Sequence, residues 1–484
     1  MKKRILALMS MVIMSTALFT GCGDDEAKKM VTDNGGVNQH GNPNEKQPTP
    51  IKDLTNINAM IKEYEESDID QYPKRGFDTE VYITPEIVHN DNNFAVAVMG
   101  LEYTDTGVNV NFAVQNDNDE AVRLVLFHSE VNKYMIYGWS GTENIEANST
   151  QQVSVHFEYE DLLRHGITAI ANMKFELDYT SSVAWGTDNI ELKTNIADSY
   201  DYSKNTYLEA VKDGSVAKIL DMDIKYVGED VLIDKNNIKV TSQVFAVDED
   251  DNHYVYLEFV NENDMRATGY IKSLSLNGVN IGEDFLESIT INPHSKEIVE
   301  VIVDAAMDYE YWNIFGINEL KNIEIEVELH GDSYSDVMLD YDKIKFEISS
   351  ETDEPDFSGK ELYNKNDISF VSKGIYHSKG RQSDSEYYWL FVVTNNCGEQ
   401  IRLDDGDCCY MVNGVDIMKY TYCELIDDGE SAIIGVRIWE SELSTRGIES
   451  IDELETIQVS FVIRKGAEDI DTAIIKEEIE EIHK

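Results

Sequence analysis

The chain has 484 residues, which is too long for one ordinary hydrophobic core and predicts about three domains. Its 93 acidic and 40 basic residues give a formal net charge of −53, and such a surface repels phosphate backbones, which argues against direct nucleic-acid binding. An apolar content of 42% is enough to fill real cores, and the many Tyr, Ile, Val and Asn residues favour strands and turns over helices.

The first 22 residues have the pattern of an export signal. Lys2-Lys3-Arg4 is a cationic start, and residues 5–19 are an apolar stretch too short to span a membrane as a stable helix. Phe19-Thr20-Gly21-Cys22 resembles a bacterial lipobox, with Phe19 where the usual pattern has Leu. The resemblance implies that Cys22 is diacylated and becomes the mature N-terminus, whereas the alternative is an ordinary signal peptide with an incidental cysteine. Two or more lipid chains, at about 0.8 kcal/mol per buried methylene, would anchor the protein stably.

The next two segments lead into the folded part. Residues 23–50 are polar and contain almost no apolar side chain, so they predict a disordered tether. Residues 51–80 are predicted to hold one short amphipathic helix and a lead-in, and packing on the first domain is favoured over binding of a partner. The residues at helical spacing are Leu54, Ile57, Met60, Ile61 and Tyr64.

Three landmarks recur three times along the rest of the chain. The first is an Asn that ends an alternating apolar strand, the second is an Asn in a hairpin turn, and the third is a Gly-Ile pair after a short helical turn. They are Asn116, Asn132 and Gly166-Ile167; Asn261, Asn277 and Gly316-Ile317; and Asn395, Asn413 and Gly447-Ile448. The first two landmarks are 16, 16 and 18 residues apart, and the second Asn precedes the Gly by 34, 39 and 34 residues. Such spacing predicts one scaffold with loops of different length.

Each landmark predicts a local structure. Apolar residues at every second position before the first Asn predict a strand with one buried face. Asn277-Gly278 and Asn413-Gly414 predict two-residue hairpins, whereas Asn132-Lys133 predicts a looser hairpin or another turn type, because Lys is strained at positive φ. Leu162 and Ile167 are placed for the hydrophobic contact of a Schellman cap around Gly166. The alternating residues are Val110, Phe112 and Val114; Val255, Leu257 and Phe259; and Trp389, Phe391 and Val393.

The last strand of each copy completes the predicted fold. It lies around residues 190–192, 344–346 and 474–475; residues 471–483 read alone suit an acidic helix, but the repeat favours a strand over 472–476. We therefore predict an all-β protein of three tandem Ig-like antiparallel β-sandwich domains, each with one short helical turn, preceded by a short N-terminal helix. The expected boundaries are 81–200 for repeat 1, 201–229 for a connector, 230–352 for repeat 2 and 353–484 for repeat 3.

The lipobox at Cys22, the strands that end in Asn and the Asn-Gly turns together resemble the tandem β-sandwich surface lipoproteins of Gram-positive bacteria, some of which are built from domains of unknown function. The resemblance spans residues 82–477. It implies the fold and a location at the membrane, and it implies little about activity because one fold hosts many functions.

The sequence contains few signs of catalytic chemistry. It has no Gly-rich phosphate loop, no His-Glu-x-x-His and no Cys-x-x-Cys, and Gly138-Trp139-Ser140-Gly141 lacks the final glycine of a nucleophile elbow. The histidines occupy no equivalent positions in the repeats. Three acidic turns are candidate calcium sites, but none has the spacing of a calcium loop, so solvated turns are favoured. These turns are residues 116–120, 248–251 and 404–407.

Cysteines and aromatic residues leave alternatives open. Four cysteines besides Cys22 lie in the third copy, where free thiols or one bridge from Cys397 to Cys408 or Cys409 rank before two bridges, and a metal site ranks last. Aromatic residues near two hairpins suit either sugar stacking or, as we favour, core packing. The fourth cysteine is Cys423, and the aromatic residues are Tyr134, Tyr137 and Trp139 and Tyr410, Tyr420 and Tyr422.

These observations predict a non-enzymatic lipoprotein, anchored through Cys22 to the extracytoplasmic face of the cell membrane, that acts as a binding or spacer module. The alternative is a polysaccharide- or solute-binding lipoprotein. We expect no catalytic residue, no cofactor and no metal site. The expected partners are the membrane and a cell-wall, polysaccharide or protein ligand, and nucleic acid is not expected.

Overall fold

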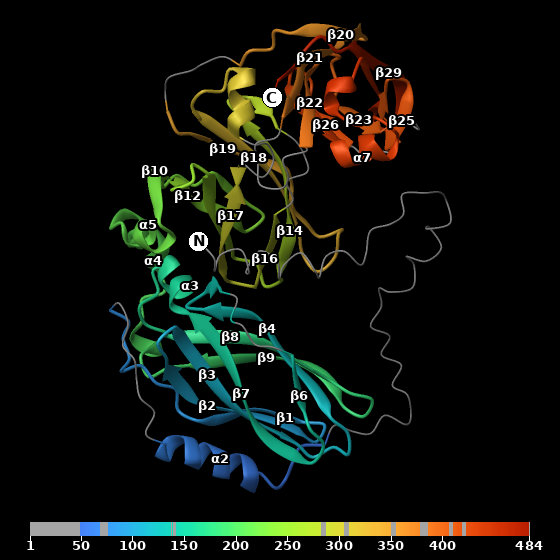
Figure 1. Cartoon of the computed structure of the whole chain (residues 1–484). Helices are drawn as coiled ribbons and strands as arrows, with labels where there is room; N and C mark the ends of the chain where they lie inside the picture. Colours follow the sequence, from blue (N-terminus) through green and yellow to red (C-terminus); the bar gives the residue numbers. More distant parts are fainter. Residues whose placement is uncertain are drawn as a thin grey trace. The chain divides into compact units, whose positions relative to one another are not determined.

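The computed structural model describes residues 49–67, 76–136, 138, 142–281, 287–303, 309–349, 355–377, 386–405, 410–418 and 423–483. Strands dominate these residues, so the prediction of an all-β protein of the sandwich type is confirmed (Figure 1). Residues 50–484 form one compact unit. The predicted signal and the predicted tether up to residue 48, Cys22 included, lie outside the described residues.

Repeat 1 follows the helix α2 (Thr55–Glu66), which confirms the predicted N-terminal helix. Strands β7 and β8 alternate between more and less buried residues, as the period-two pattern predicts, whereas nearly every residue of β2 and β3 is buried. The elements are β1 (Glu86–Asp91), β2 (Phe94–Tyr103), β3 (Gly107–Asn116), β4 (Val122–Val131), β5 (Tyr134–Met135), β6 (Glu143–Ile145), β7 (Ser149–Glu158), α3 (Tyr159–Arg164), β8 (Asn172–Thr180) and β9 (Trp185–Lys193).

The segment 201–229, expected as a connector, contains more structure than the sequence indicated. Asn205 accepts a hydrogen bond from Leu208 N at 2.8 Å and so caps the first of two short helices. A strand of the repeat 2 sheet begins at Met222, still within this segment. The elements between β9 and this strand are η2 (Ala197–Ser199), α4 (Thr206–Lys212) and α5 (Ser215–Leu220).

Repeats 2 and 3 follow the order of repeat 1 with additions: repeat 2 has two strands, β10 and β11, beside β12, and repeat 3 has β23 and β24 where repeat 1 has β4, together with η4 and β30. Repeat 2 consists of β10 (Met222–Gly228), β11 (Ile233–Lys235), β12 (Ile238–Asp248), β13 (His253–Asn261), β14 (Ala267–Leu276), β15 (Val279–Asn280), β16 (Ser288–Ile291), β17 (Lys296–Ile302), η3 (Tyr309–Phe315), β18 (Asn322–His330) and β19 (Val337–Glu347). Repeat 3 consists of β20 (Lys360–Lys365), β21 (Ile368–His377), β22 (Glu386–Asn395), β23 (Ile401–Asp405), β24 (Tyr410–Val412), β25 (Val415–Met418), β26 (Cys423–Ile426), β27 (Ser431–Trp439), α7 (Glu440–Thr445), η4 (Ile451–Glu453), β28 (Thr456–Lys465), β29 (Glu468–Glu478) and β30 (Ile482–His483).

Each repeat has two sheets, and the second sheet of one repeat continues into the first sheet of the next. The first sheet of repeat 1 has the order β1-β2-β3-β7. A ten-stranded sheet then joins β9-β8-β4-β5 of repeat 1 to β17-β13-β12-β10 of repeat 2, and a second one joins β19-β18-β14-β15 to β27-β22-β21-β20. The last sheet has the order β25-β24-β28-β23-β26, with β29 beside β28. The array therefore begins and ends with a sheet that belongs to one repeat alone.

The Asn that ends β3, β13 and β22 has the same role in every repeat. Asn116 Nδ2 donates to the carbonyls of Glu120, Ile145 and Glu146, and its Oδ1 accepts from Asn118 N. Asn261 and Asn395 repeat this pattern. In each case Oδ1 accepts from the backbone amide two residues later, and Nδ2 donates to the carbonyl four residues later and to the turn before the next long strand. All three are fully buried. Each Asn thus holds two turns together, which explains its recurrence better than a turn preference does.

The hairpin Asn is a second recurring clamp, and it corrects one prediction. Asn132 and Lys133 have φ of 51° and 73°, the same left-handed geometry as Asn277-Gly278 and Asn413-Gly414, so the expected looser turn at Lys133 is wrong. Asn132 Nδ2 donates to Ala169 O, and its Oδ1 accepts from the backbone amides of Ala171, just before β8, and Asn172, its first residue. The other two hairpin asparagines make the equivalent bonds. This clamp fixes the turn and imposes the strained backbone on Lys133.

We expect Lys133→Gly to stabilise repeat 1 by about 0.5–1 kcal/mol, because glycine adopts positive φ without a steric penalty. Lys133→Val should destabilise it by about 1–2 kcal/mol for the opposite reason. Thermal unfolding of both variants measures the effect. Glycine also removes the cation–π contact of Lys133 with Tyr202, so a fall in stability on both substitutions would show that this contact outweighs the strain.

The Gly-Ile landmarks form the predicted Schellman caps. Ile167 N donates to Leu162 O at 2.9 Å, Ile317 N to Trp312 O at 2.9 Å, and Ile448 N to Leu443 O at 3.0 Å. The last strand of repeat 3 also follows the prediction. Residues 468–478 form β29 and pair with β28, so the repeat pattern predicted this segment correctly and the acidic helix is ruled out.

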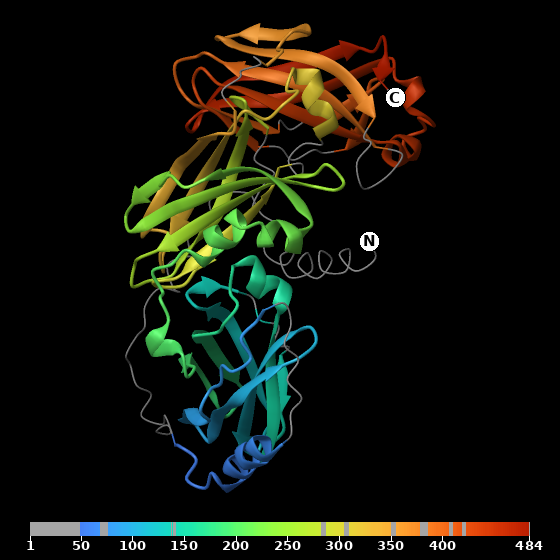
Figure 2. The same cartoon turned by 90° about the vertical axis from the view of Figure 1, so that its left-hand side faces the viewer.

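Helix α2 packs on the outer face of the first sheet, against β2 and β3 (Figures 1 and 2). Ile57 is fully buried there, in a small cluster separate from the three main cores. Its sheet partners are small, chiefly Ala95, Ala97 and Ala113, which lets the helix approach closely. Burial of Ile57 contributes about 1.5–3 kcal/mol, and a helix of this length is marginal alone, so α2 depends on this contact.

Candidate functional site at the repeat junctions

Two hairpin strands carry the sheets across the repeat boundaries. Strand β5 pairs in parallel with β17, where Tyr134 lies opposite Lys296 and Lys296 N donates to Lys133 O at 2.7 Å. Strand β15 pairs in parallel with β27, where Val279 lies opposite Ser431. The same hairpin therefore builds both junctions, and the sheets are mixed rather than purely antiparallel at these positions.

Apolar side chains of one repeat also complete the core of its neighbour. Core residues of repeat 1 pack on one face of the first sheet of repeat 2. In the same way, core residues of repeat 2 pack on the equivalent face of the first sheet of repeat 3. The residues contributed by repeat 2 are Val244, Ala246 and Tyr256, and those contributed by repeat 3 are Leu390, Val392 and Ile433. Both faces of these sheets are buried, so the junctions resemble domain interiors more than flexible linkers.

Glu258 is the most deeply buried carboxylate at the first junction. Its side chain is fully buried and accepts hydrogen bonds from Tyr134 Oη at 3.1 Å, Asn205 Nδ2 at 2.5 Å and Thr241 Oγ1 at 2.5 Å. Lys296 Nζ lies 3.4 Å from Oε1. Burial is the largest cause that raises the pKa of Tyr134, and the negative charge of Glu258 is the second. The Tyr134 hydroxyl therefore stays a donor at neutral pH. Donors from repeat 1, the connector and repeat 2 thus satisfy one carboxylate.

A second set of polar contacts lies beside it. Glu130 of repeat 1 is buried, accepts from Ser295 Oγ of repeat 2 and lies 3.3 Å from Lys174 Nζ. Burial raises the pKa of Glu130 despite these partners. Arg266 of repeat 2 forms an ion pair with Glu176 of repeat 1. Burial alone would raise the pKa of Glu176, but its contacts with Arg266 and His128 outweigh burial and lower the pKa. One ion pair, Arg266 with Glu176, and one hydrogen bond, from Ser295 to Glu130, thus cross the boundary here.

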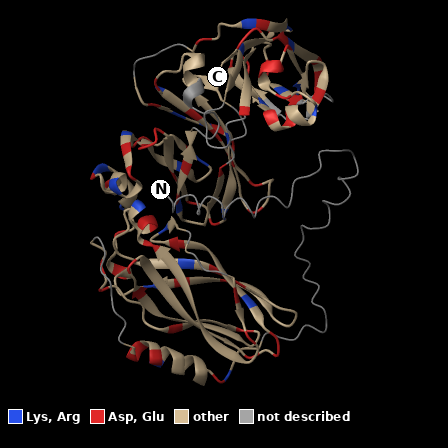
Figure 3. Cartoon of the chain, in the orientation of Figure 1, with Lys and Arg blue, Asp and Glu red and all other residues tan. Residues whose placement is uncertain are grey.

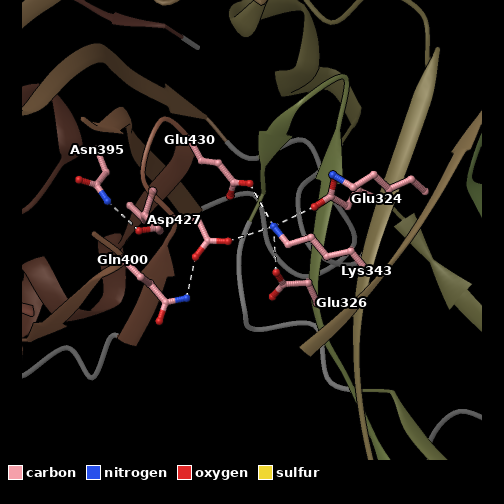
Figure 4. Close-up of polar contacts among 9 residues, drawn as sticks. Glu324, Glu326, Lys343, Asn395, Gln400, Asp427 and Glu430 are labelled. Atoms are coloured by element: carbon pink, nitrogen blue, oxygen red, sulfur yellow. Dashed lines mark hydrogen bonds and ion pairs between the residues drawn. The ribbon is translucent and has the colours of Figure 1, made fainter. Parts of the chain in front are cut away.

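Lys343 is the centre of the second junction (Figure 4). Its Nζ lies 3.0 Å from Glu324 and 3.2 Å from Glu326 of repeat 2, and 3.1 Å from both Asp427 and Glu430 of repeat 3. Partial burial alone would lower the pKa of Lys343, but hydrogen bonds to Glu324, Asp427 and Glu430 outweigh it and raise the pKa. One ammonium group therefore joins four carboxylates from two repeats.

Two shallow depressions lie elsewhere on the surface. The larger, of about 520 Å³, is lined in part by Arg402 and Arg464, but both arginines are paired with Asp404. The smaller, of about 280 Å³, lies near the first junction and is lined by residues of both charges, including Lys133, Lys174 and Glu191. Acidic residues are spread over all three repeats (Figure 3).

The acidic turns act as hydrogen-bond acceptors within the fold. Asn116 and Asn118 belong to the first clamp. Asp248 accepts from Asp250 N, Asn252 N and Tyr254 Oη; burial would raise its pKa, but these bonds lower it. Asp404 pairs with arginines, and residues 406–407 lie outside the described residues. Within the described ranges, no group of three or more His, Cys, Asp or Glu side chains is arranged to hold a metal ion.

The remaining candidate residues divide into buried and undescribed ones. Tyr134 and Tyr410 are buried, which favours the core interpretation for both. Cys397 is a free thiol. The other candidates have side chains outside the described residues: Tyr137, Trp139, Ser140, Gly141, Cys408, Cys409, Tyr420, Tyr422 and Cys423. No helix among the described residues is long and apolar enough to cross a membrane.

The comparisons with known proteins identify no family. No family model matches the chain, and no curated protein matches it. Solved structures match only weakly. A protein from Archaeoglobus fulgidus is 14% identical with a TM-score of 0.16, covering 27% of this chain and 98% of that one. Red sea bream transglutaminase is 9% identical with a TM-score of 0.15, covering 63% and 37%. The YadV chaperone is 10% identical with a TM-score of 0.14, covering 49% and 91%.

Proposed function

We propose that this protein is a membrane-anchored extracytoplasmic lipoprotein whose three β-sandwich repeats form a non-enzymatic scaffold that holds a binding surface away from the membrane. The observation that carries the scaffold part is the continuity of the sheets across both repeat boundaries. Flexible linkers between domains leave their relative positions free, whereas a shared sheet with buried polar contacts restricts them.

The polar groups support the same proposal. Glu258, Lys343 and Asp404 are the kinds of residues that catalytic sites use, yet each is surrounded by partners from the fold itself. The anchoring part rests on the sequence, with the cationic start, the apolar stretch and the lipobox that ends at Cys22.

We expect Cys22→Ala to move the protein from the membrane fraction to soluble fractions of a bacterial host and to abolish its labelling by an alkyne-tagged fatty acid, because alanine has no thiol to carry the proposed lipid. Cys397→Ala is the matched control, since its thiol lies in repeat 3, and it should change neither result. Retention of the label in Cys22→Ala would contradict lipidation at this residue. Retention in the membrane without the label would point to an uncleaved signal segment as the anchor.

A further inference from the structure

Equivalent positions on the first sheet of each repeat face outward and are nevertheless buried. The clamp asparagines align Ala113 with Glu258 and Val392, each three residues before its Asn. Five residues before the Asn, the aligned set is Asn111, Tyr256 and Leu390. Side chains at alternate positions share one face, and the residues between them fill the cores. All six outward residues are at most 2% exposed.

What covers this outer face differs at the start of the array. In repeat 2 the face is covered by repeat 1, where Tyr134 contacts Glu258. In repeat 3 it is covered by repeat 2, whose core includes Val392. In repeat 1, α2 covers it, with Ile57 buried near Ala113 and Tyr64 Oη accepting a hydrogen bond from Asn111 Nδ2 at 3.2 Å. Helix α2 therefore occupies on repeat 1 the place that a preceding repeat occupies on repeats 2 and 3.

The other end of the array presents the complementary surface, which no other repeat of the described part of the chain covers. Strand β25 is the counterpart of β5 and β15, but it ends its sheet, and no strand of the described residues pairs with its outer edge. Val415 on this strand is 40% exposed. The strand registers place Ile474 of repeat 3, opposite Ser460, at the position of Lys343 in repeat 2. Ile474 is 60% exposed, whereas Lys343 contacts the next repeat.

We propose that α2 is a cap that prevents head-to-tail association, and that a chain whose α2 is undocked binds, through the exposed first sheet of repeat 1, to the open end of repeat 3 of a second copy. The two internal junctions supply the template for this contact, because each joins the same two surfaces. No strand of the described residues pairs with the outer edge of β7, which can therefore receive β25 as β17 receives β5. Such a contact joins two different surfaces, so it leads to chains or rings rather than closed dimers.

The test uses the full chain with Cys22→Ser, so that lipid does not cause association. Ile57→Asp places a charge in the buried α2 contact, and Lys62→Asp is the matched control on the exposed side of the same helix. Sedimentation velocity of Ile57→Asp should show a weight-average mass that rises about twofold or more with concentration, while the control stays monomeric. Adding Ile474→Lys to Ile57→Asp should abolish the association, because it places a charge on the open end.

Hydrogen exchange distinguishes undocking from unfolding, since α2 should lose protection while the core strands β2 and β3 keep theirs. If repeat 1 unfolds in Ile57→Asp, a variant that lacks residues 51–66 is used in place of Ile57→Asp. A peptide of residues 50–67 added to this deletion variant should then reverse the association. A monomer at all concentrations with α2 undocked would overturn the proposal. Association that Ile474→Lys leaves unchanged would equally overturn it, because repeat 3 would then not be the partner surface.

Discussion

Asn261→Ala is expected to lower the free energy of unfolding of repeat 2 by about 3–5 kcal/mol. Asn261 is fully buried, and its side chain donates to the carbonyls of Met265, Ile291 and Asn292 and accepts from Asn263 N. Alanine removes every one of these bonds and leaves buried backbone groups without a partner, at about 1–3 kcal/mol each, partly offset where water enters.

The measurement is hydrogen exchange of the β12 and β13 amides, because global unfolding of a chain with three repeats is not expected to be two-state. Asn413→Gly is the matched control. Asn413 makes a clamp of the same kind in an exposed hairpin, and glycine keeps its φ of 50° without strain. Water can replace the exposed bonds, so we expect a loss of only about 0.5–1.5 kcal/mol. Equal losses at both sites would contradict the importance of burial.

Lys343→Met is expected to weaken the junction between repeats 2 and 3 by about 2–3 kcal/mol at neutral pH. The substitution keeps most of the apolar stem but leaves Glu324, Glu326, Asp427 and Glu430 without the ammonium group that separates them. Loss of one partner from a buried charge pair costs about 3–5 kcal/mol, and these side chains are partly exposed, which reduces the cost. Calorimetry should show separate transitions for repeats that unfold together in the parent protein.

The effect of Lys343 should depend on pH in a defined direction. The pKa of Lys343 is raised, so its contribution is complete below the unfolded value of 10.5 and is lost only as pH rises through the higher folded value. Burial would raise the pKa of Asp427, but the hydrogen bond from Lys343 lowers it, so its contribution is present above 3.8 and is lost as pH falls through the lowered value. The parent and Lys343→Met should therefore begin to converge in stability as pH falls below 3.8, and the convergence should be complete only below the lowered pKa of Asp427.

Lys345→Met is the control for the lysine charge itself. Lys345 also contacts Glu324, but its side chain is 65% exposed, and among the described residues it acts on repeat 3 through its charge near Asp427 rather than through an ion pair. We expect a change within about 0.5 kcal/mol. A label pair at Tyr270 of repeat 2 and Ile474 of repeat 3, attached through unnatural amino acids, adds a direct readout. Its distance distribution should broaden in Lys343→Met and remain narrow in Lys345→Met. A broad distribution in the parent protein would contradict the proposed scaffold.

Local signals explain the features that sequence reasoning predicted. Period-two burial, the Asn-Gly turns and the Gly-Ile caps each depend on residues close together in the chain, so the strands, hairpins and helical turns followed from the sequence. The turn at Asn132-Lys133 did not, because the bonds from Asn132 to the start of β8 override the preference of Lys133. Sequence reasoning judged that turn by the residue within it and missed the residues that hold it.

The junction residues Glu258 and Lys343 were also missed, although one signal pointed to a covered face. The outward positions of repeat 1 hold Asn111, Ala113 and Gln115, whereas those of repeat 3 include Leu390 and Val392. An outward face that is apolar indicates burial on both sides of a sheet. This signal could have predicted that the first sheet of repeat 3 is covered, but not by which part of the chain.

The sequence by itself determined the all-β class, the threefold repetition and the positions of most strands, because these depend on short-range pattern and on backbone preferences. Only the tertiary structure decided which edges pair between repeats, that β5 and β15 extend the next sheet, and that α2 covers the face left open on repeat 1. A strand edge carries the same backbone donors and acceptors whatever its side chains are, so its partner is selected by the packing of distant residues.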